Sequence, residues 1–527
     1  MKGLFVTNVR VTSVLDLEAL LPEFEIDSFC ALMLNPPLSL LSDDLIGYLV
    51  EHVARISFLD EAFVKFITIS LTGSSPAEPL ARLSGSLTDK TLHNLSLADP
   101  AFTKFCQKYI FQTLNLGREE GTRSRISKKL AQVKRILDDQ PSFANRVRKV
   151  QLFIEHRQNA WLFQNSSRNH PRRKDAAYAI TFIGILELLA NSPMLPHELH
   201  FSTGIYPIED PVLVVGRLSQ SFFSQSLTIL HLAVCENVPL PLFLLCPRLK
   251  EVCLDRVGAT DEDYDRYPDD QCSGRVSPAL ELFNYRGSHT VVKQMITPPP
   301  KFHTPVVLWS NLRVLKLSPH EREEMGLLRP ILDAACTLEE LYLTNVRVGP
   351  GGWSIYDTMK QIWQVSQQDE QIPLAGLVNL GSLSRLRVFA LYAKIKCDAP
   401  GSGVLHDVKA VLGTIPASNT VTNLSLEFDI IGEHPFDGCL DEDWVGVCDE
   451  VIRVSSGKPL ELDLKMAVDN GKFDPGYGED NLYVDIMGKT ASLSDHPKIC
   501  VHFWNPTYWN HGLGPFPRGQ VRSRCRR

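Results

Sequence analysis

One spacing of apolar residues returns along most of this 527-residue chain and constrains its fold more than any other feature. In NLRVLKLSP the apolar positions are Leu312, Leu315 and Leu317. The last two are two residues apart, so they face the same side of a strand, and the first lies at the bend that leads into it. One short strand cannot bury its apolar side alone. The spacing therefore indicates a unit that stacks on similar units.

The same spacing returns in SLTILHLAVC, RLKEVCLDRV, ALELFNYRG, TLEELYLTNV, RLRVFALYA and TVTNLSLEF. Degenerate members are RVRKVQLFI, ELHFST, LELDLKM and KICVHFW, and helix-like stretches such as AQVKRILDD, FIGILELLA, MGLLRPILDAAC and VLHDVKAVLG lie between the strands. We therefore expect an α/β fold, with an irregular leucine-rich-repeat solenoid and a parallel sheet over residues 146–510. The alternative is an ordinary α/β domain whose parallel strands share this spacing.

Chemical motifs are incomplete in this sequence. HEREE resembles a zinc-protease helix, but Glu324 stands where the second histidine belongs, so we expect a solvated helix start. DEDYDRYPDD resembles the start of a calcium loop, but Arg266 replaces the required glycine, so we expect a flexible acidic insertion. We expect no enzymatic activity, no cofactor and no metal. A hydrolase with a scattered catalytic site is the alternative from the enzyme class.

The totals favour an intracellular protein without nucleic-acid or membrane partners. A net charge of −7 and a pI near 6.1 give no overall attraction to phosphate backbones or anionic membranes. The 12 cysteines form no CxxC pair and lie in or near apolar runs, so we expect buried free thiols in a reducing compartment. The apolar stretch Tyr178–Ala190 is too short to span a bilayer, and we expect it to be a buried amphipathic helix. The predicted location is cytoplasmic, nuclear or both.

The front of the chain differs from the rest. LSLLSDDLIGYLVEHVARI reads as an amphipathic helix with Asp43 and Asp44 in its first turn. A second apolar set follows around Leu92, and the aromatic-rich LADPAFTKFCQKYIFQTLNLG ends in a short strand with Leu114 and Leu116. Three short helices bury too little surface to offset chain entropy alone. We therefore interpret this block as a docking module.

These segments, LLSDDLIGYLVEHV and LHNLSLADPAFTKFCQKYIFQTLNLG, resemble the F-box, especially its fungal form. Ser42 stands where that family usually has proline, and an insertion near residues 56–87 replaces a short connection. F-boxes dock on the small adaptor that links them to a cullin-type (SCF) ubiquitin ligase. The resemblance implies that the adaptor would contact Leu41, Leu45, Leu49, Leu92, Leu95, Leu97 and Phe102.

The order of the segments also resembles fungal F-box proteins with degenerate leucine-rich repeats. We divide the chain into an N-terminal extension (1–37), an F-box-like module (38–117), a linker helix (118–145), the solenoid (146–510) and a basic tail (511–527), which we expect to be disordered. The linker helix would bury Leu130, Val133, Ile136 and Leu137, and the aromatic-rich Val501–Phe516 would cap the last repeat.

The resemblance implies a non-catalytic substrate receptor of a ubiquitin ligase whose repeats bind a protein substrate. Residues between the fixed leucines point outward in such repeats and would contact the substrate. The candidates are Thr228, Glu251, Arg313, Glu340 and Arg387. The alternative is a leucine-rich-repeat interaction scaffold that is not coupled to a ligase.

Overall fold

The structure is a computed structural model in which two compact units are distinguished. It describes residues 111–116, 123–153, 181, 184–202, 223–260, 264–269, 274–318, 322–344, 373–396, 403–431, 437–469, 479–505 and 520–524. The first unit comprises Met1–Asn115, Arg135–Val150 and Asn191–Met194, and the second comprises Leu116–Lys134, Gln151–Ala190 and Leu195–Arg527.

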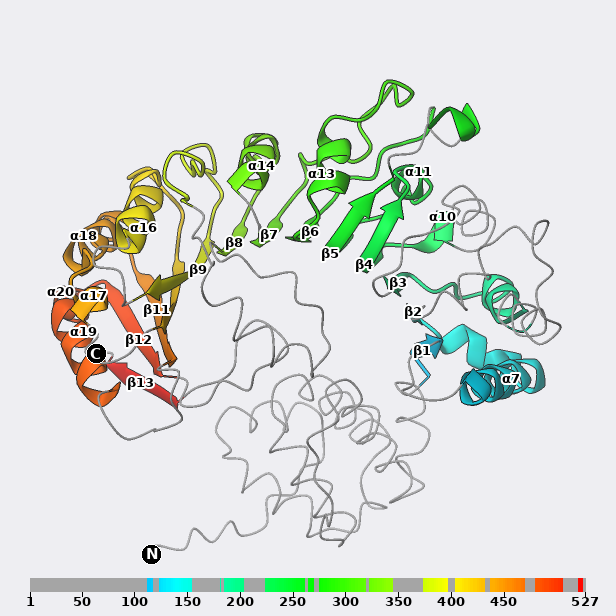
Figure 1. Ribbon diagram of the computed structural model, residues 1–527, viewed down its shortest axis with the longest axis horizontal. Coiled ribbons are helices and arrows are strands. Elements are labelled where there is room, and N and C mark those ends of the chain that lie inside the picture. Colours follow the sequence, from blue (N-terminus) through cyan, green and yellow to red (C-terminus); the bar gives the residue numbers. More distant parts are fainter. Residues whose placement is uncertain are drawn as a thin grey trace, which may run out of the picture. The chain divides into compact units, whose positions relative to one another are not determined.

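The described chain is α/β, with a thirteen-stranded sheet whose strands follow one another in chain order (Figure 1). Neighbouring strands from β3 to β12 pair in parallel, and β12 pairs with β13 in antiparallel orientation. The strands are β1 (Thr113–Leu116), β2 (Lys149–Phe153), β3 (Glu198–Ser202), β4 (Ile229–Val238), β5 (Glu251–Ala259), β6 (Leu282–Arg286), β7 (Val314–Ser318), β8 (Glu340–Thr344), β9 (Val388–Lys396), β10 (Asn423–Ile431), β11 (Leu460–Asp469), β12 (Ile499–Asn505) and β13 (Gln520–Arg524). The predicted parallel strands are confirmed in every segment with the leucine spacing.

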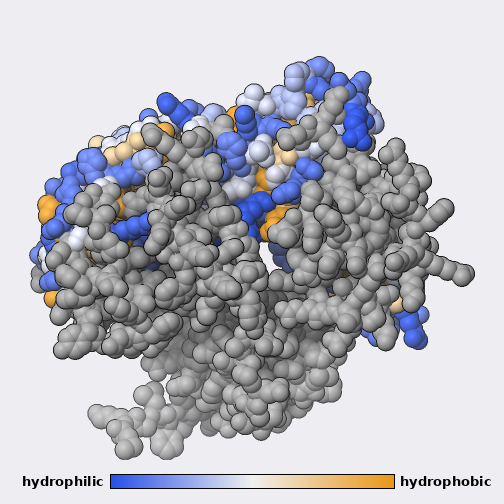
Figure 2. Space-filling view, viewed as in Figure 1, coloured by the Kyte–Doolittle hydropathy of each residue, from blue (hydrophilic) through white to orange (hydrophobic). Residues whose placement is uncertain are grey.

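Helices lie between the strands in sequence, and α13, α14, α16 and α18 lie on one side of the sheet (Figure 1). The α-helices are α7 (Arg123–Asp139), α10 (Phe223–Ser226), α11 (Pro241–Leu244), α13 (His289–Ile296), α14 (Arg322–Ala334), α16 (Val404–Gly413), α17 (Asp437–Leu440), α18 (Trp444–Ser455), α19 (Glu479–Lys489) and α20 (Ala491–Ser494); the 3-10 helices are η2 (Pro141–Arg146) and η4 (Tyr264–Arg266). Most described residues on the face drawn in Figure 2 are hydrophilic.

The spaced leucines form the core of the second unit. Leu312 and Leu315 are 0% exposed, and Leu317 is 1% exposed. Burying one such side chain contributes about 1.5–3 kcal/mol. The corresponding apolar residues of the neighbouring units are buried as well: Leu227, Leu230, Leu232, Leu249, Val252, Leu254, Leu338, Leu341 and Leu343. Stacked units therefore share one continuous apolar layer.

A repeated backbone link joins each unit to the one before it. The N–H groups of Arg313 and Val314 both donate to the carbonyl oxygen of Glu281, at 2.8 and 3.0 Å. Glu339 and Glu340 donate in the same way to Arg313, both at 2.9 Å. The link lies at the start of each strand, just after the first leucine of the spacing. It keeps successive strands in a common register.

β4 and β5 carry a matching irregularity that sequence spacing does not reveal. Val234 (φ 52°) and Arg256 (φ 54°) adopt left-handed backbone conformations, which are uncommon for residues with a Cβ atom. After Val234 the buried positions move from Leu230 and Leu232 to Cys235. In each strand, the left-handed residue changes which side chains face the core. The register between β4 and β5 is the same on both sides of these two residues, and it shifts further along, between Cys235 and Val238.

Three predictions about burial are wrong. Tyr264 and Tyr267 of the acidic insertion are buried, and the Tyr264 hydroxyl donates to Gln294 Oε1 at 2.8 Å. Glu324, predicted at a solvated helix start, is 4% exposed. Ile136 of the linker helix is 43% exposed, whereas Leu130 and Leu137 are buried as predicted. In each case tertiary packing overrides the average polarity of the segment, so the burial of a single side chain does not follow from its neighbours in the chain.

The C-terminal end also departs from prediction. Gln520–Arg524, in the tail expected to be disordered, form β13 against the outer edge of β12. Val501–Phe503 belong to β12, as predicted for KICVHFW, so this part of the expected cap is itself the last parallel strand. Backbone pairing at an edge strand covers exposed N–H and C=O groups. Cys500 is disulfide-bonded, against the expectation of free thiols, whereas six other described cysteines are free.

In the first unit, the described residues form a small packed cluster. The rings of Phe111 and Phe143 stack with centroids 4.5 Å apart, and the Ser192 hydroxyl donates to Asn145 Oδ1 at 2.7 Å. The predicted F-box helices and every predicted adaptor contact, from Leu41 to Phe102, lie outside the described residues. The strand predicted to end that module is β1 of the sheet.

Within the apolar stretch Tyr178–Ala190, residues 184–190 are helical, and Ile185 and Leu189 are both 0% exposed. Within the described ranges, no helix combines the length and apolar character that crossing a membrane requires.

Candidate protein-binding face of the sheet

Along strands β3–β12, buried side chains alternate with side chains that point to the other side of the sheet, most of which are half-buried. We call this other side of the sheet the open face. Parallel register places one residue of each strand beside its equivalent in the next strand. One such column, the central column, consists of His200, His231, Cys253, Asn284, Lys316, Tyr342, Ala390, Ser425, Asp463 and His502. The open face therefore presents imidazole, amide, ammonium, phenol and carboxylate groups at regular spacing.

The five predicted substrate contacts occupy two different positions. Glu251 and Glu340 begin β5 and β8 and are half-buried on the open face. Thr228, Arg313 and Arg387 each stand one residue before a strand. They belong to a second row along the sheet, which we call the rim row and which consists of Thr228, Lys250, Glu281, Arg313, Glu339, Arg387 and Thr422. The structure thus brings the candidates to one region but does not place them on one surface.

Charges alternate along the middle of the rim row. Lys250 Nζ lies 2.7 Å from Glu281 Oε1, and Arg313 Nη2 lies 3.0 Å from Glu339 Oε2. The hydrogen bond from Arg313 holds the pKa of Glu339 below its usual range, and the Arg387 charge acts in the same direction. These pairs are exposed, so each contributes little to stability.

Around β7 and β8, an aromatic ring is held between two charges on the open face. The Tyr342 hydroxyl donates to Glu340 Oε2 at 2.9 Å, and Lys316 Nζ lies 5.0 Å from the centre of the Tyr342 ring. Burial and the Glu340 carboxylate raise the pKa of Tyr342 to about 12, so the phenol stays protonated at neutral pH. Tyrosines held rigidly in this way are frequent binding hot spots in protein interfaces.

A third polar group lies on β9, β10 and β11. The Tyr392 hydroxyl donates to Asp429 Oδ2 at 3.3 Å, and Lys465 Nζ lies 3.9 Å from Glu427 Oε2. Burial raises the pKa of Glu427, and the Lys465 charge only partly opposes this. Burial also raises the pKa of Tyr392, with the Asp429 charge acting in the same direction.

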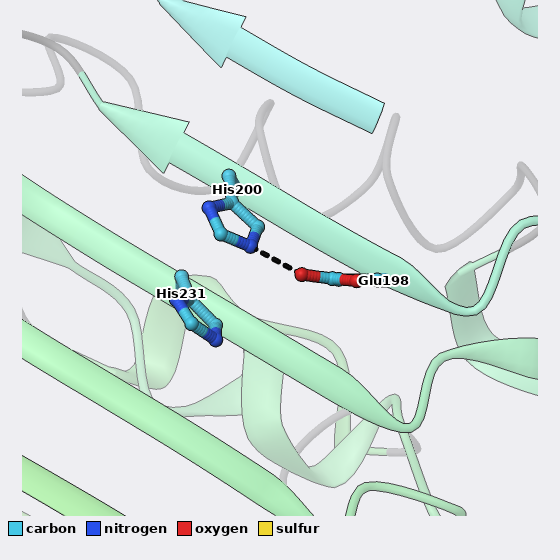
Figure 3. A group of neighbouring side chains, drawn as sticks. All are labelled: Glu198, His200 and His231. Carbon is cyan, nitrogen blue, oxygen red and sulfur yellow. Dashed lines mark hydrogen bonds and ion pairs between the residues drawn. The ribbon is translucent and has the colours of Figure 1, made fainter. Parts of the chain in front are cut away.

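At the other end of the open face, Glu198 and His200 of β3 gather with His231 of β4 (Figure 3). Glu251 of β5 is near enough to interact electrostatically with Glu198. His200 Nε2 lies 2.6 Å from Glu198 Oε1, and the ring of His231 stacks on that of His200 with centroids 3.9 Å apart. Burial, followed by the Glu198 and Glu281 charges, raises the pKa of Glu251. Spacing along the chain did not reveal this cluster, because its histidines belong to different repeats.

Cys253 is the next residue of the central column, and its thiol is poorly suited to nucleophilic chemistry. Burial and the nearby Glu251 charge raise the pKa of its thiol to about 11. At neutral pH the thiol is therefore protonated, whereas catalytic cysteines act as thiolates. Burial also raises the pKa of the Cys246 thiol, to about 12.

The chain matches no described protein family, and no curated protein is significantly similar to it. Its resemblance to the F-box therefore stays a prediction from the quoted residues.

Proposed function

We propose that this protein is a non-catalytic substrate-recognition subunit of a cullin-type (SCF) ubiquitin ligase. Residues 146–510 would form an irregular leucine-rich-repeat solenoid that binds a protein substrate, and residues 38–117 would dock on the ligase adaptor. Ubiquitin transfer would be carried out by the partner enzymes, with this chain supplying proximity.

The observation that carries the binding part is the parallel register of the strands. It lines up polar and aromatic residues along the open face while the leucines of the same strands are buried. A repeated sheet of this kind offers an extended surface on which each strand adds one more column of contacts. Glu251 and Glu340 are the proposed substrate contacts on that face, and Thr228, Arg313 and Arg387 border it from the rim row.

The ligase part depends on the sequence pattern of the front block. Apolar residues at Leu41, Leu45 and Leu49 exceed what one small core needs, so we assign them to an adaptor interface. An interface of about 800 Å² per partner is within reach of such a patch.

Adaptor capture tests this proposal. Full-length protein carrying Leu45→Asp and Leu49→Asp is expected to lose the adaptor in a pull-down, because two carboxylates cannot be buried unpaired in an apolar interface. Val276, which is 72% exposed in the second unit, provides the matched control: Val276→Asp should bind the adaptor as the wild type does.

Circular dichroism and thermal unfolding of both variants show whether the sheet remains folded. Equal capture by the wild type and the double variant contradicts the docking assignment. If the wild-type protein captures no adaptor at all, the second function remains, a repeat scaffold that is not coupled to a ligase.

A further inference from the structure

We propose that Glu198, His200 and His231 form a binding site for a divalent transition-metal ion, with Zn²⁺ the first ion to test. The site goes beyond the proposed function and does not depend on it. Its residues come from β3 and β4, at one end of the open face (Figure 3).

The donor set is the first argument. One ligand atom from each of the three side chains lies within 4.8 Å of the other two. Two imidazoles and one carboxylate are the protein ligands of many zinc sites, and the same set holds non-haem iron. Calcium and magnesium prefer oxygen ligands alone, so the histidines select against them. The chemistry of the three groups therefore matches a first-row transition metal.

The backbone is the second argument. His200 and His231 are direct partners in the parallel β3–β4 register, and Glu198 lies two residues before His200 on the same side of β3. All three side chains are half-buried, so the sheet limits their freedom without excluding solvent. Ligands on rigid strands keep their geometry better than ligands on loops.

The required movement is small. Ligand atoms around a tetrahedral zinc ion are about 3.3 Å apart, as follows from metal–ligand distances of about 2 Å. His200 Nε2 and Glu198 Oε1 are now 2.6 Å apart and would separate slightly, while the His231 nitrogen would approach. The His200 and His231 rings are now stacked at 18° to each other, so side-chain rotations would also have to tilt them until their nitrogen lone pairs point at one ion.

The surroundings favour a cation. Glu251 on β5 is near enough to Glu198 for their charges to repel each other. A bound divalent ion would offset the negative charges of both glutamates. Three protein ligands leave one position of a tetrahedral zinc ion unfilled, and it would face the open side of the sheet, where a water molecule or a partner side chain would complete it.

Zinc titration of the full-length protein tests the site. Protein stripped of metal with a chelator and exchanged into chelator-free buffer is titrated with Zn²⁺ by calorimetry, and with Co²⁺ while its visible absorption is recorded. We expect the variant with His200→Ala and His231→Ala to lose one bound ion per chain and the Co²⁺ absorption of that site. Glu198→Gln should weaken zinc binding at this site at least about tenfold, since even groups that only support metal ligands have effects of that size.

His502 supplies the matched control, because it occupies the same central column in β12. His502→Ala should bind zinc at the site like the wild type. If circular dichroism shows that the double variant is misfolded, the single variant His231→Gln is titrated in the same way and tests the site instead. The proposal is overturned if stoichiometry and affinity are unchanged in the folded histidine variants, or if the wild type binds no zinc at micromolar concentrations.

Discussion

At the scale of single residues, Glu427 in β10 and Glu339, one residue before β8, lie in opposite electrostatic environments. Burial raises the pKa of Glu427, so its folded carboxylate is disfavoured at neutral pH. The hydrogen bond from Arg313 lowers the pKa of Glu339, so its folded carboxylate is favoured. The two residues therefore contribute to stability with opposite dependence on pH.

Glutamine substitutions at these two positions test that difference. Above the pKa of Glu427 in the folded protein, its buried carboxylate is charged and lowers the free energy of unfolding. This loss disappears as the pH falls to the pKa of Glu427 in the unfolded chain, because the side chain is then protonated in the folded protein. Glu427→Gln should therefore stabilise the protein, relative to wild type, more at pH 7 than at pH 4.5. Glu339 contributes stability above its unfolded pKa and loses it as the pH falls through its folded pKa, so Glu339→Gln should be more destabilising at pH 7 than at pH 4.5.

Urea unfolding of both variants and the wild type at the two pH values measures these differences. The Glu339 effect should be small, because solvent screens an exposed pair. For each variant, the change in unfolding free energy relative to wild type is compared between pH 7 and pH 4.5. If this change moves in the same direction with pH for both variants, the assigned environments are contradicted.

At the scale of the element, alternation along a strand decides which side chains stabilise the fold. Leu315 of β7 is 0% exposed, and its neighbour Lys316 lies on the open face. Leu315→Ala should lower the free energy of unfolding by about 2–5 kcal/mol, through lost burial and a cavity.

Lys316→Ala is the matched control, one residue further along the same strand. Its effect should stay below about 1 kcal/mol, because it removes a partly exposed side chain and leaves no cavity. Chemical denaturation of both variants compares them directly. A similar loss in both would mean that β7 does not present alternate faces to the core and to solvent.

The strands are also the elements that local sequence specified best. Apolar residues at the second and third positions of the spacing fixed the strand and its buried side, as in Leu341 and Leu343 of β8. The left-handed conformations of Val234 and Arg256 were not foreseeable, because neither residue favours a left-handed backbone. The two residues lie opposite each other in the paired strands β4 and β5, and neither strand alone encodes that pairing.

At the scale of the whole molecule, the open face is the proposed place of substrate binding. Substitution of Tyr342→Ala together with Lys316→Ala should abolish capture of at least one cellular protein that the wild type retains when the proteasome is blocked. The reason is that the pair presents a fixed aromatic ring beside a charge. Affinity purification with quantitative mass spectrometry provides the measurement.

Lys293→Ala is the control for this comparison, since Lys293 is exposed on α13 rather than on the sheet. It should retain the same proteins as the wild type. An identical set of captured proteins in all three samples would remove the open face from the proposed function.

The sequence by itself determined where strands and helices form and which apolar side chains are buried, because those depend on spacing within about ten residues. Leu312, Leu315 and Leu317 were assigned to the core in this way, and all three are buried. Which residues of different strands become neighbours was decided only by the register in which the strands pair. His200 and His231 lie 31 positions apart in the chain, and the bend, helix or insertion between two strands has no fixed length, so only the folded sheet brings their rings together.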